Sequence, residues 1–163
     1  MNDFLAHDPD KFEDPLANFD PKEYESSLQE ALVERTVGQI PPQPAQRISP
    51  TDTVRDAVQK MAQGNLASLL VVDQQGCVIG IFTERDVLDN VAEQYERVAD
   101  HAISEVMTAD PAVVYDSDPS AAAIASIAVA GHRHVPVLGV GGSLIGTLEP
   151  RHVFAFMEKY FDK

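Results

Sequence analysis

A hydroxyl and a carboxylate stand three residues apart where an apolar run gives way to charged residues, in Gly80-Ile81-Phe82-Thr83-Glu84-Arg85-Asp86. At the end of a strand and the start of a helix, Thr83 and Asp86 would face the same opening. An ionised carboxylate can accept two hydrogen bonds from a vicinal diol such as that of a ribose. The N–H groups of the helix start and the Arg85 guanidinium would attract a phosphate. These residues therefore indicate a site for a small ligand that carries a diol and a phosphate.

The same spacing has a second interpretation, which needs no ligand. A threonine followed three residues later by an acidic residue is close to a capping box, which stabilises a helix start by about 1 kcal/mol. Taken alone, the spacing favours the helix cap, because capping boxes are common. Both interpretations can hold together, because a helix cap and a ligand can share these groups.

The chain contains one block twice, and this duplication favours the ligand interpretation. Residues 61–88 and 127–154 superpose without a gap at a constant shift of 66 positions. The identical pairs are Ala62/Ala128, Val71/Val137, Gly76/Gly142, Ile79/Ile145, Gly80/Gly146, Arg85/Arg151 and Val87/Val153. Duplication of a whole supersecondary unit predicts two similar packed units.

The apolar pattern predicts the elements of each unit. In the first copy it predicts helix 53–63, strand 68–72, strand 77–83 and helix 84–95; in the second, helix 119–130, strand 134–138, strand 143–148 and helix 150–161. We therefore expect an α/β (α+β) fold of two β-α-β-β-α repeats. Neither repeat can cover both faces of its sheet, so the two should pack sheet to sheet with helices outside and pseudo-twofold symmetry.

Residues 1–35 are predicted to form an acidic N-terminal arm. Nine acidic and two basic side chains lie in residues 1–30. Asp20-Pro21 is typical of a helix start, and the following apolar spacing predicts a helix over 21–36 that docks on the body or on a second subunit. The domain boundaries are then expected at 36–98 and 99–163.

Composition excludes several classes of protein. The net charge of −14 and the pI near 4.5 disfavour nucleic acid as a partner. No apolar run approaches the ~20 residues that span a bilayer, so we expect no membrane insertion. The acidic N-terminus lacks the pattern of a secretory signal, and the single cysteine, Cys77, can form no intrachain disulfide. These features favour a cytoplasmic protein.

A family resemblance covers about residues 36–161. The segment 80–86 resembles the G-h-x-[ST]-x-x-D signature of cystathionine-β-synthase (CBS) domains, and Arg133-His134-Val135-Pro136-Val137 resembles the R-H-x-P-V segment of that family. Val106-Met107-Thr108 with Val113-Val114 resembles its first strand. The resemblance implies a regulatory module of two CBS domains that binds AMP, ADP, ATP or S-adenosylmethionine between the repeats, without a metal. It also implies a homodimer shaped as a flat disc.

The resemblance further implies which residues bind the ligand. They are Thr83, Arg85, Asp86, Thr108, Val113, Val114, Arg133, His134 and Pro136. The apolar slot for the adenine ring would consist of Val113, Val114, Val135 and Pro136, while Arg133 and His134 would face the phosphates. Without a ligand, Arg133 would form a surface ion pair of small energy, and the apolar residues would be core.

The second copy lacks the polar pair of the first. Glu149 and His152 stand at the positions of Thr83 and Asp86. Glu149 adds a negative charge where a phosphate would approach, and His152 cannot accept a bidentate contact from a diol. Facing this cleft are Leu66, Ala67 and Ser68, in place of His132, Arg133 and His134. We therefore predict one functional site per chain.

Other classes of function remain open. A ligand-free scaffold that dimerises or docks an unidentified partner protein would use the same fold. His132-x-His134 suggests a metal site with Glu149 and His152, although zinc usually needs three or four ligands. An enzyme is disfavoured, because neither GxxxxGK nor G-x-S-x-G occurs and Cys77, expected to be a buried structural thiol, has no neighbouring base.

Overall fold

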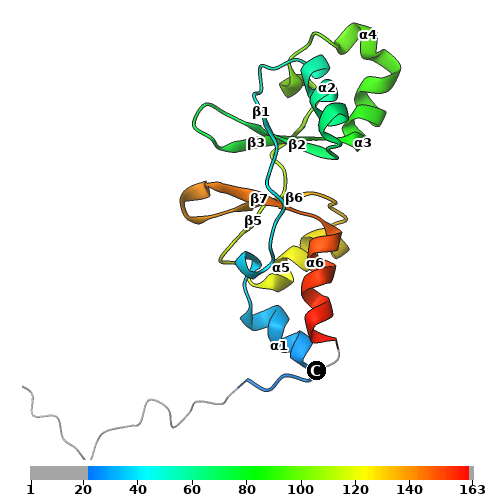
Figure 1. The fold of residues 1–163 in the computed structure, drawn as a ribbon. Helices are drawn as coiled ribbons and strands as arrows, with labels where there is room; N and C mark the ends of the chain where they lie inside the picture. The colour runs from blue at the N-terminus through cyan, green and yellow to red at the C-terminus, as the bar shows by residue number, and fades with distance from the viewer. Residues whose placement is uncertain (1–21, 162–163) are drawn as a thin grey trace, which may run out of the picture.

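Each copy of the repeated block folds into a small sheet with helices on one face. In this computed structural model, which describes residues 22–161, the two sheets face each other and the helices lie on the outer sides (Figure 1). The predicted sheet-to-sheet arrangement of two β-α-β-β-α repeats is thus confirmed.

The first repeat holds a four-stranded sheet in the order β1-β2-β3-β4. Strand β1 runs parallel to β2, and β2-β3 is the predicted hairpin. The elements are β1 (Arg47–Ile48), α2 (Val54–Gly64), β2 (Ser68–Val72), β3 (Val78–Thr83), α3 (Glu84–Asp86), η3 (Val87–Val91), η4 (Ala92–Gln94), α4 (Tyr95–Val98), η5 (Ile103–Glu105) and β4 (Thr108–Ala109).

The second repeat holds a three-stranded sheet in the order β5-β6-β7, with β5 parallel to β6 and β6-β7 a hairpin. Its elements are β5 (Val114–Tyr115), α5 (Ser120–Ile124), η6 (Ala125–Val129), β6 (Val135–Leu138), η7 (Val140–Gly142), β7 (Leu144–Leu148), α6 (Pro150–Met157) and η8 (Glu158–Tyr160). Ahead of both repeats lie α1 (Ser27–Glu34) and η2 (Val37–Gln39).

The expected single helix 84–95 is broken into several turns. After α3 the chain winds as a π-helix over η3, then as a 3-10 turn. The wider π turn leaves Asp86 and Val91, five residues apart, both buried. Cys77 was also placed wrongly: it is exposed in the turn before β3, where its N–H donates to Asp73 Oδ1 at 2.8 Å.

The N-terminal helix is shorter than predicted and packs on the second repeat of its own chain. It begins at Ser27, because the Ser26 side chain accepts the N–H of Gln29 at 3.1 Å. Asp20 and Pro21 lie outside the described residues. The fully buried Ser120 donates through Oγ to the carbonyl of Ala31 at 2.9 Å, and Ala31 belongs to the hydrophobic core of the second repeat.

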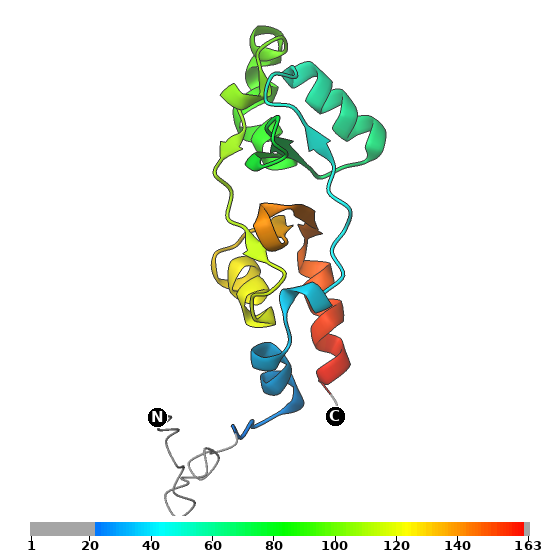
Figure 2. The ribbon, with the colours of Figure 1, turned by 90° about the vertical axis from the view of Figure 1, so that its left-hand side faces the viewer.

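The chain crosses between the two repeats twice. Val37 and Ile40 pack in the core of the second repeat, whereas Ile48 packs in the core of the first. The chain returns through Met107, at the margin of the first core, to Val114 in the second. Figure 2 shows the two connecting segments on opposite sides of the molecule. The repeats therefore share one interleaved chain path.

Each crossing passes directly over a glycine of the repeated block. A Cβ at Gly80 would lie 2.2 Å from Met107 Sδ, and a Cβ at Gly146 would lie 2.6 Å from the carbonyl oxygen of Gln43. That carbonyl also accepts the N–H of Thr147 at 2.9 Å. At Gly146 only glycine lets the backbone approach this closely, whereas at Gly80 the contact is with the flexible Met107 side chain.

The capping box at the start of α6 has a histidine, His152, at the third helical position, where the boxes of α2 and α3 have an aspartate. Glu149 is its N-cap, and its N–H donates to His152 Nδ1 at 3.0 Å. Burial and the neighbouring Arg151 guanidinium lower the pKa of His152, while Glu149 opposes this shift. The neutral imidazole thus takes over a role that Asp56 and Asp86 fill in α2 and α3.

Gly146→Ala should lower the free energy of unfolding by about 1–3 kcal/mol, because the Gln43 carbonyl cannot move without losing its bond to Thr147. Gly80→Ala should cost less, since the Met107 thioether is flexible. Urea unfolding measures both variants. A Gly146→Ala protein as stable as the parent would contradict the close crossing. Without that contact, alanine should stabilise the strand relative to glycine.

Stability should fall as pH drops from about 7.5 to 5.5, because unfolded histidine binds its proton near pH 6.5 while the folded pKa of His152 lies lower. His152→Asn keeps a neutral acceptor and should show a smaller drop in urea midpoint. A drop in His152→Asn as large as that of the parent would rule out this contribution.

Candidate functional site

Strand β3 ends at Thr83, and the chain turns at once into α3, so that Thr83 and Asp86 form a closed capping box. The N–H and Oγ1 of Thr83 donate to Asp86 Oδ2 at 2.8 and 2.6 Å, and the N–H of Asp86 returns to Thr83 Oγ1 at 3.3 Å. The capping interpretation is therefore correct for the structure. The side chain of Asp86 is held rigidly, and the residue is only 8% exposed.

Asp86 also binds the segment that leaves the first repeat. Thr108 Oγ1, at the start of β4, donates to Asp86 Oδ1 at 2.9 Å. An ionised carboxylate offers about four acceptor positions, so three protein donors leave about one, on Oδ1. A diol could use that position with one hydroxyl, and could use a second where Thr108 turns its hydroxyl away. The sequence predicted both residues at the site but not this bond between them.

A cavity of about 650 Å³ opens beside this pair and is lined by both repeats. The predicted residues that it brings together are Thr83, Arg85, Asp86, Thr108, Arg133 and His134. The other residues of its wall are Ala67, Ile81, Glu84, Leu88, Asp89, Gly131 and His132. Its volume lies in the range of about 300–1,000 Å³ that is typical of small-molecule sites.

The predicted adenine slot is not part of this wall. Val114 and Val135 lie in the core of the second repeat under the helices, and Pro136 is buried. Val113 is half-buried and does not line the cavity. The apolar wall comes instead from Ala67, Ile81 and Leu88.

Strand alternation could have predicted this wall. Phe82 belongs to the helix-covered core of the first repeat. Because successive side chains of a strand point to opposite faces, Ile81 must face the other sheet. Leu88 gives no comparable signal, since its place depends on the π turn in which it lies.

The charged groups of the wall differ in how far they are already engaged. Arg85 Nε pairs with Asp89 Oδ2 at 3.3 Å. Arg133, which is exposed, makes no hydrogen bond or ion pair with any residue of 22–161. Burial lowers the pKa of His134, which is half-buried, whereas the nearby carboxylate of Glu149 raises it. Arg133 is therefore the cation that is available to an incoming anion.

The pseudo-symmetric cleft of the second copy is nearly closed. Its cavity measures about 20 Å³, enough for about one water molecule, and is lined by Gln43, Pro44, Ala45, Gln46, Leu66, Ala67, Ser68, Thr147 and Glu149. The carboxylate of Glu149 pairs with Arg151 Nε at 3.1 Å, and Arg151 also donates to the Gln43 side chain. The substitutions in the second copy thus coincide with a filled cleft.

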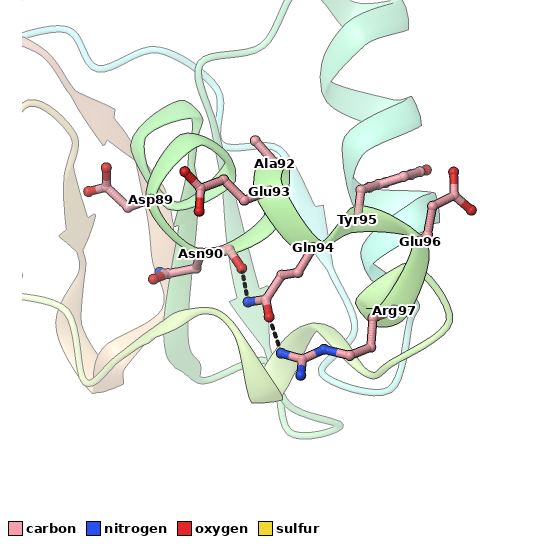
Figure 3. Close-up of a pocket in the computed structure, with 8 residues that line it drawn as sticks. All are labelled: Asp89, Asn90, Ala92, Glu93, Gln94, Tyr95, Glu96 and Arg97. Atoms are coloured by element: carbon pink, nitrogen blue, oxygen red, sulfur yellow. Dashed lines mark hydrogen bonds between the residues drawn. The ribbon is translucent and has the colours of Figure 1, made fainter.

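A further cavity, of about 800 Å³, lies on the helix side of the first repeat (Figure 3). One continuous segment, residues 89–97, supplies its whole wall, with Gln94 bonded to the Asn90 carbonyl and to Arg97. It contains none of the predicted residues. The cavity between the repeats is the better candidate, because groups from two distant parts of the chain converge there.

Residues 22–161 contain neither a cluster of metal-ligating side chains nor a membrane-spanning helix. No group of three His, Cys, Asp or Glu side chains in this range is placed to hold a metal ion; His132 Nδ1 instead lies 3.1 Å from Ser126 Oγ. No helix in the same range is long and apolar enough to span a bilayer.

Curated relatives share the repeated part of the chain. An uncharacterized 17.7 kDa protein of Acidianus ambivalens is 32% identical over 104 residues, covering 64% of this chain and 62% of that protein. The CBS domain-containing protein CBSCBSPB1 of Arabidopsis thaliana is 29% identical over 116 residues, covering 71% of this chain and 21% of that protein. The chain thus spans less than two thirds of the length of either relative.

Solved structures share the fold. A protein with CBS domains from Burkholderia ambifaria has a TM-score of 0.64 and 30% identity, covering 78% of this chain and 96% of that one. CBSX2 of Arabidopsis thaliana, solved in complex with AMP, has a TM-score of 0.65 and 23% identity, covering 77% of this chain and 97% of that one. The CBS domain protein PAE2072 of Pyrobaculum aerophilum, complexed with AMP, has a TM-score of 0.65 and 20% identity, covering 76% of this chain and 98% of that one.

A comparison with protein families matches the CBS domain twice, at residues 37–93 and 103–159. These two matches account for most of the chain, and each contains one copy of the repeated block with its hairpin, β2-β3 or β6-β7. The chain belongs to the CBS domain family, as a tandem pair.

Proposed function

We propose that this CBS pair is a regulatory module that binds an adenosine nucleotide, or S-adenosylmethionine, at one site per chain. The observation that carries the proposal is the cavity of about 650 Å³ between the repeats, with the Asp86 carboxylate on one side and Arg133, which has no partner within residues 22–161, on the other. The AMP complexes of CBSX2 and PAE2072 have the same fold, which supports this class of ligand.

The proposed contacts follow from the groups on the wall. Asp86 would accept a ribose hydroxyl at the free position of Oδ1, and Thr108 would share that oxygen. Arg133 would face the anionic end of the ligand, and the adenine ring would pack on the apolar wall at Ala67, Ile81 and Leu88. The nearly closed second cleft, of about 20 Å³, supports a single site per chain.

A ligand in this position would touch both repeats, so it could bias their relative arrangement. It would contact Asp86 in the first repeat and the segment from Gly131 to His134 in the second. The effect on a partner protein can only equal the difference in ligand affinity between the two arrangements. We propose no catalytic step, and the module would act in the cytoplasm on a protein still to be identified.

We also propose a homodimer formed through the outer helices. Phe154 on α6 is 59% exposed, and its ring centroid lies 6.2 Å from that of Phe161, which is itself 47% exposed. Neighbouring exposed aromatic side chains on an outer helix are typical of a surface that a second copy covers.

Ligand binding can be tested by thermal melts with AMP, ADP, ATP and S-adenosylmethionine. A ligand at about 100 times its Kd should add about 2.7 kcal/mol to folding stability. Asp86→Asn should remove the shift, and titration calorimetry of the parent should give one ligand per chain. No shift with any ligand would favour the ligand-free scaffold, and two equivalent ligands per chain would contradict the single site.

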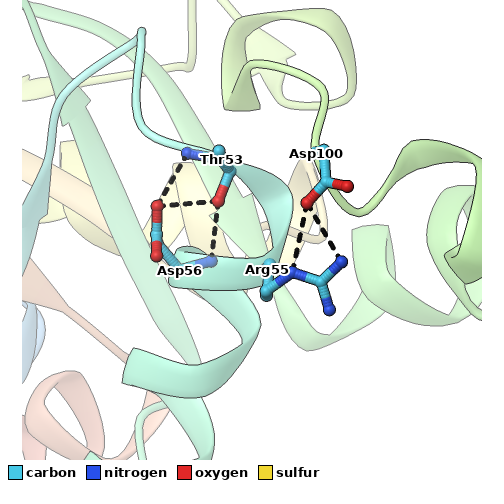
Figure 4. A network of polar contacts seen from close by, with 4 residues as sticks. All are labelled: Thr53, Arg55, Asp56 and Asp100. Atoms are coloured by element: carbon cyan, nitrogen blue, oxygen red, sulfur yellow. Dashed lines mark hydrogen bonds and ion pairs between the residues drawn. The ribbon is translucent and has the colours of Figure 1, made fainter.

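The matched control is Asp56→Asn. Asp56 caps α2 with the same geometry, since Thr53 N–H and Oγ1 donate to its Oδ2 at 3.2 and 2.7 Å (Figure 4). This variant loses the same charge and a comparable cap, and it should keep the ligand shift of the parent. Arg133→Gln, at an exposed and unpaired side chain, should weaken binding of AMP without a change in fold.

Phe154→Lys should convert the dimer into a monomer, because a charge would then be buried in the apolar contact. Sedimentation equilibrium measures the mass. Val140→Lys, at a side chain 91% exposed in the turn before β7, is the control and should keep the mass of the parent. A Phe154→Lys protein with unchanged mass would contradict this interface.

A further inference from the structure

The ionised groups around the cavity between the repeats are mostly negative. Three carboxylates, those of Glu84, Asp86 and Asp89, stand against the guanidinium groups of Arg85 and Arg133. The chain as a whole carries a net charge of −14, so its long-range field also opposes anions. A phosphorylated ligand must therefore be held by local cations.

Of these two cations, only Arg133 has no partner among the residues that the structure describes. Arg85 is already paired with Asp89 at 3.3 Å, one turn later on the same helical segment. Arg133 comes from the other repeat and has no hydrogen bond or ion pair within residues 22–161. His134 adds no charge at pH 8, because burial lowers its pKa.

We infer that the site selects adenosine ligands with a single anionic group beyond the ribose and discriminates against nucleoside triphosphates. The inference rests on the proposed function and adds the charge class of the ligand. With the ribose at Asp86 and one anionic group at Arg133, any further phosphate would lie near Glu84 and Asp89 without a free cation. Both the phosphate of AMP and the carboxylate of S-adenosylmethionine meet this requirement.

The size of the effect follows from the charges. An uncompensated phosphate several ångströms from a carboxylate is repelled with an energy that depends on how much water lies between them. At a partly open site we expect the Kd of ATP to be about tenfold or more above the Kd of AMP. Salt screens such interactions, so the ratio should shrink as ionic strength rises.

Calorimetric titration of the full chain at pH 8, at low ionic strength and with EDTA, measures the affinities of adenosine, AMP, ADP, ATP and S-adenosylmethionine. EDTA removes divalent cations that would neutralise the phosphates. Affinity should fall in the order AMP, ADP, ATP. Arg133→Gln should raise the Kd of AMP by about tenfold and leave the Kd of adenosine unchanged, because adenosine has no anionic group. The values for AMP and S-adenosylmethionine show which anionic group the site prefers.

Asp89→Asn is the decisive variant. It removes one carboxylate and releases Arg85 from its ion pair, so it should narrow the ratio of the Kd of ATP to that of AMP several-fold. Asp100→Asn is the matched control, because Asp100 pairs with Arg55 at 3.0 Å in another exposed ion pair (Figure 4), and neither residue lines the cavity. It changes the net charge equally and should keep the parent's ratio.

The outcomes separate the two proposals. ATP bound as tightly as AMP, or an equal change of the ratio in Asp89→Asn and Asp100→Asn, would overturn the charge selection and leave the nucleotide site standing. Absence of binding by every ligand of the panel would overturn the proposed function and the charge selection together.

Discussion

The chain's two crossings between the repeats constrain the rest of the structure. At each crossing the chain lies against a hairpin glycine: the backbone carbonyl of Gln43 leaves no room for a methyl group at Gly146, and the side chain of Met107 packs on Gly80. The first crossing fills one cleft, where Gln43 forms a β-bridge with Thr147 and its side chain accepts a hydrogen bond from Arg151. The second brings Thr108 to Asp86 beside an open cavity. One symmetric topology thus produces one closed cleft and one open one.

The difference between the clefts arises from a few side chains. Where the first copy has Thr83 and Asp86, the second has Glu149 and His152, and each pair caps its helix. A capping box therefore does not distinguish a binding site from a structural one. What distinguishes them is the remaining acceptor capacity of Asp86 and the cation at Arg133, which has no partner within residues 22–161 and whose counterpart is Ala67. Arg85 and its counterpart Arg151 are both paired, with Asp89 and Glu149.

Much of the fold could be predicted, because the repeated block fixes the hairpins 68–83 and 134–148 and their packing. The pairing of Asp86 with Thr108 could not, since no periodicity relates residues 22 positions apart. Val114 and Val135 do not line the cavity, because they belong to the core of the second repeat, and the adenine slot stays a prediction. The short N-terminal helix could have been found from Ser26-x-x-Gln29, a capping pattern. The predicted ligand contacts themselves await a bound structure.

A crystal structure of the protein with AMP tests the central claim most directly. The account predicts one AMP per chain in the cavity between the repeats, with a ribose hydroxyl on Asp86 Oδ1 and the phosphate on Arg133. An AMP molecule in the cleft beside Glu149, or one that touches neither Asp86 nor Arg133, would contradict it.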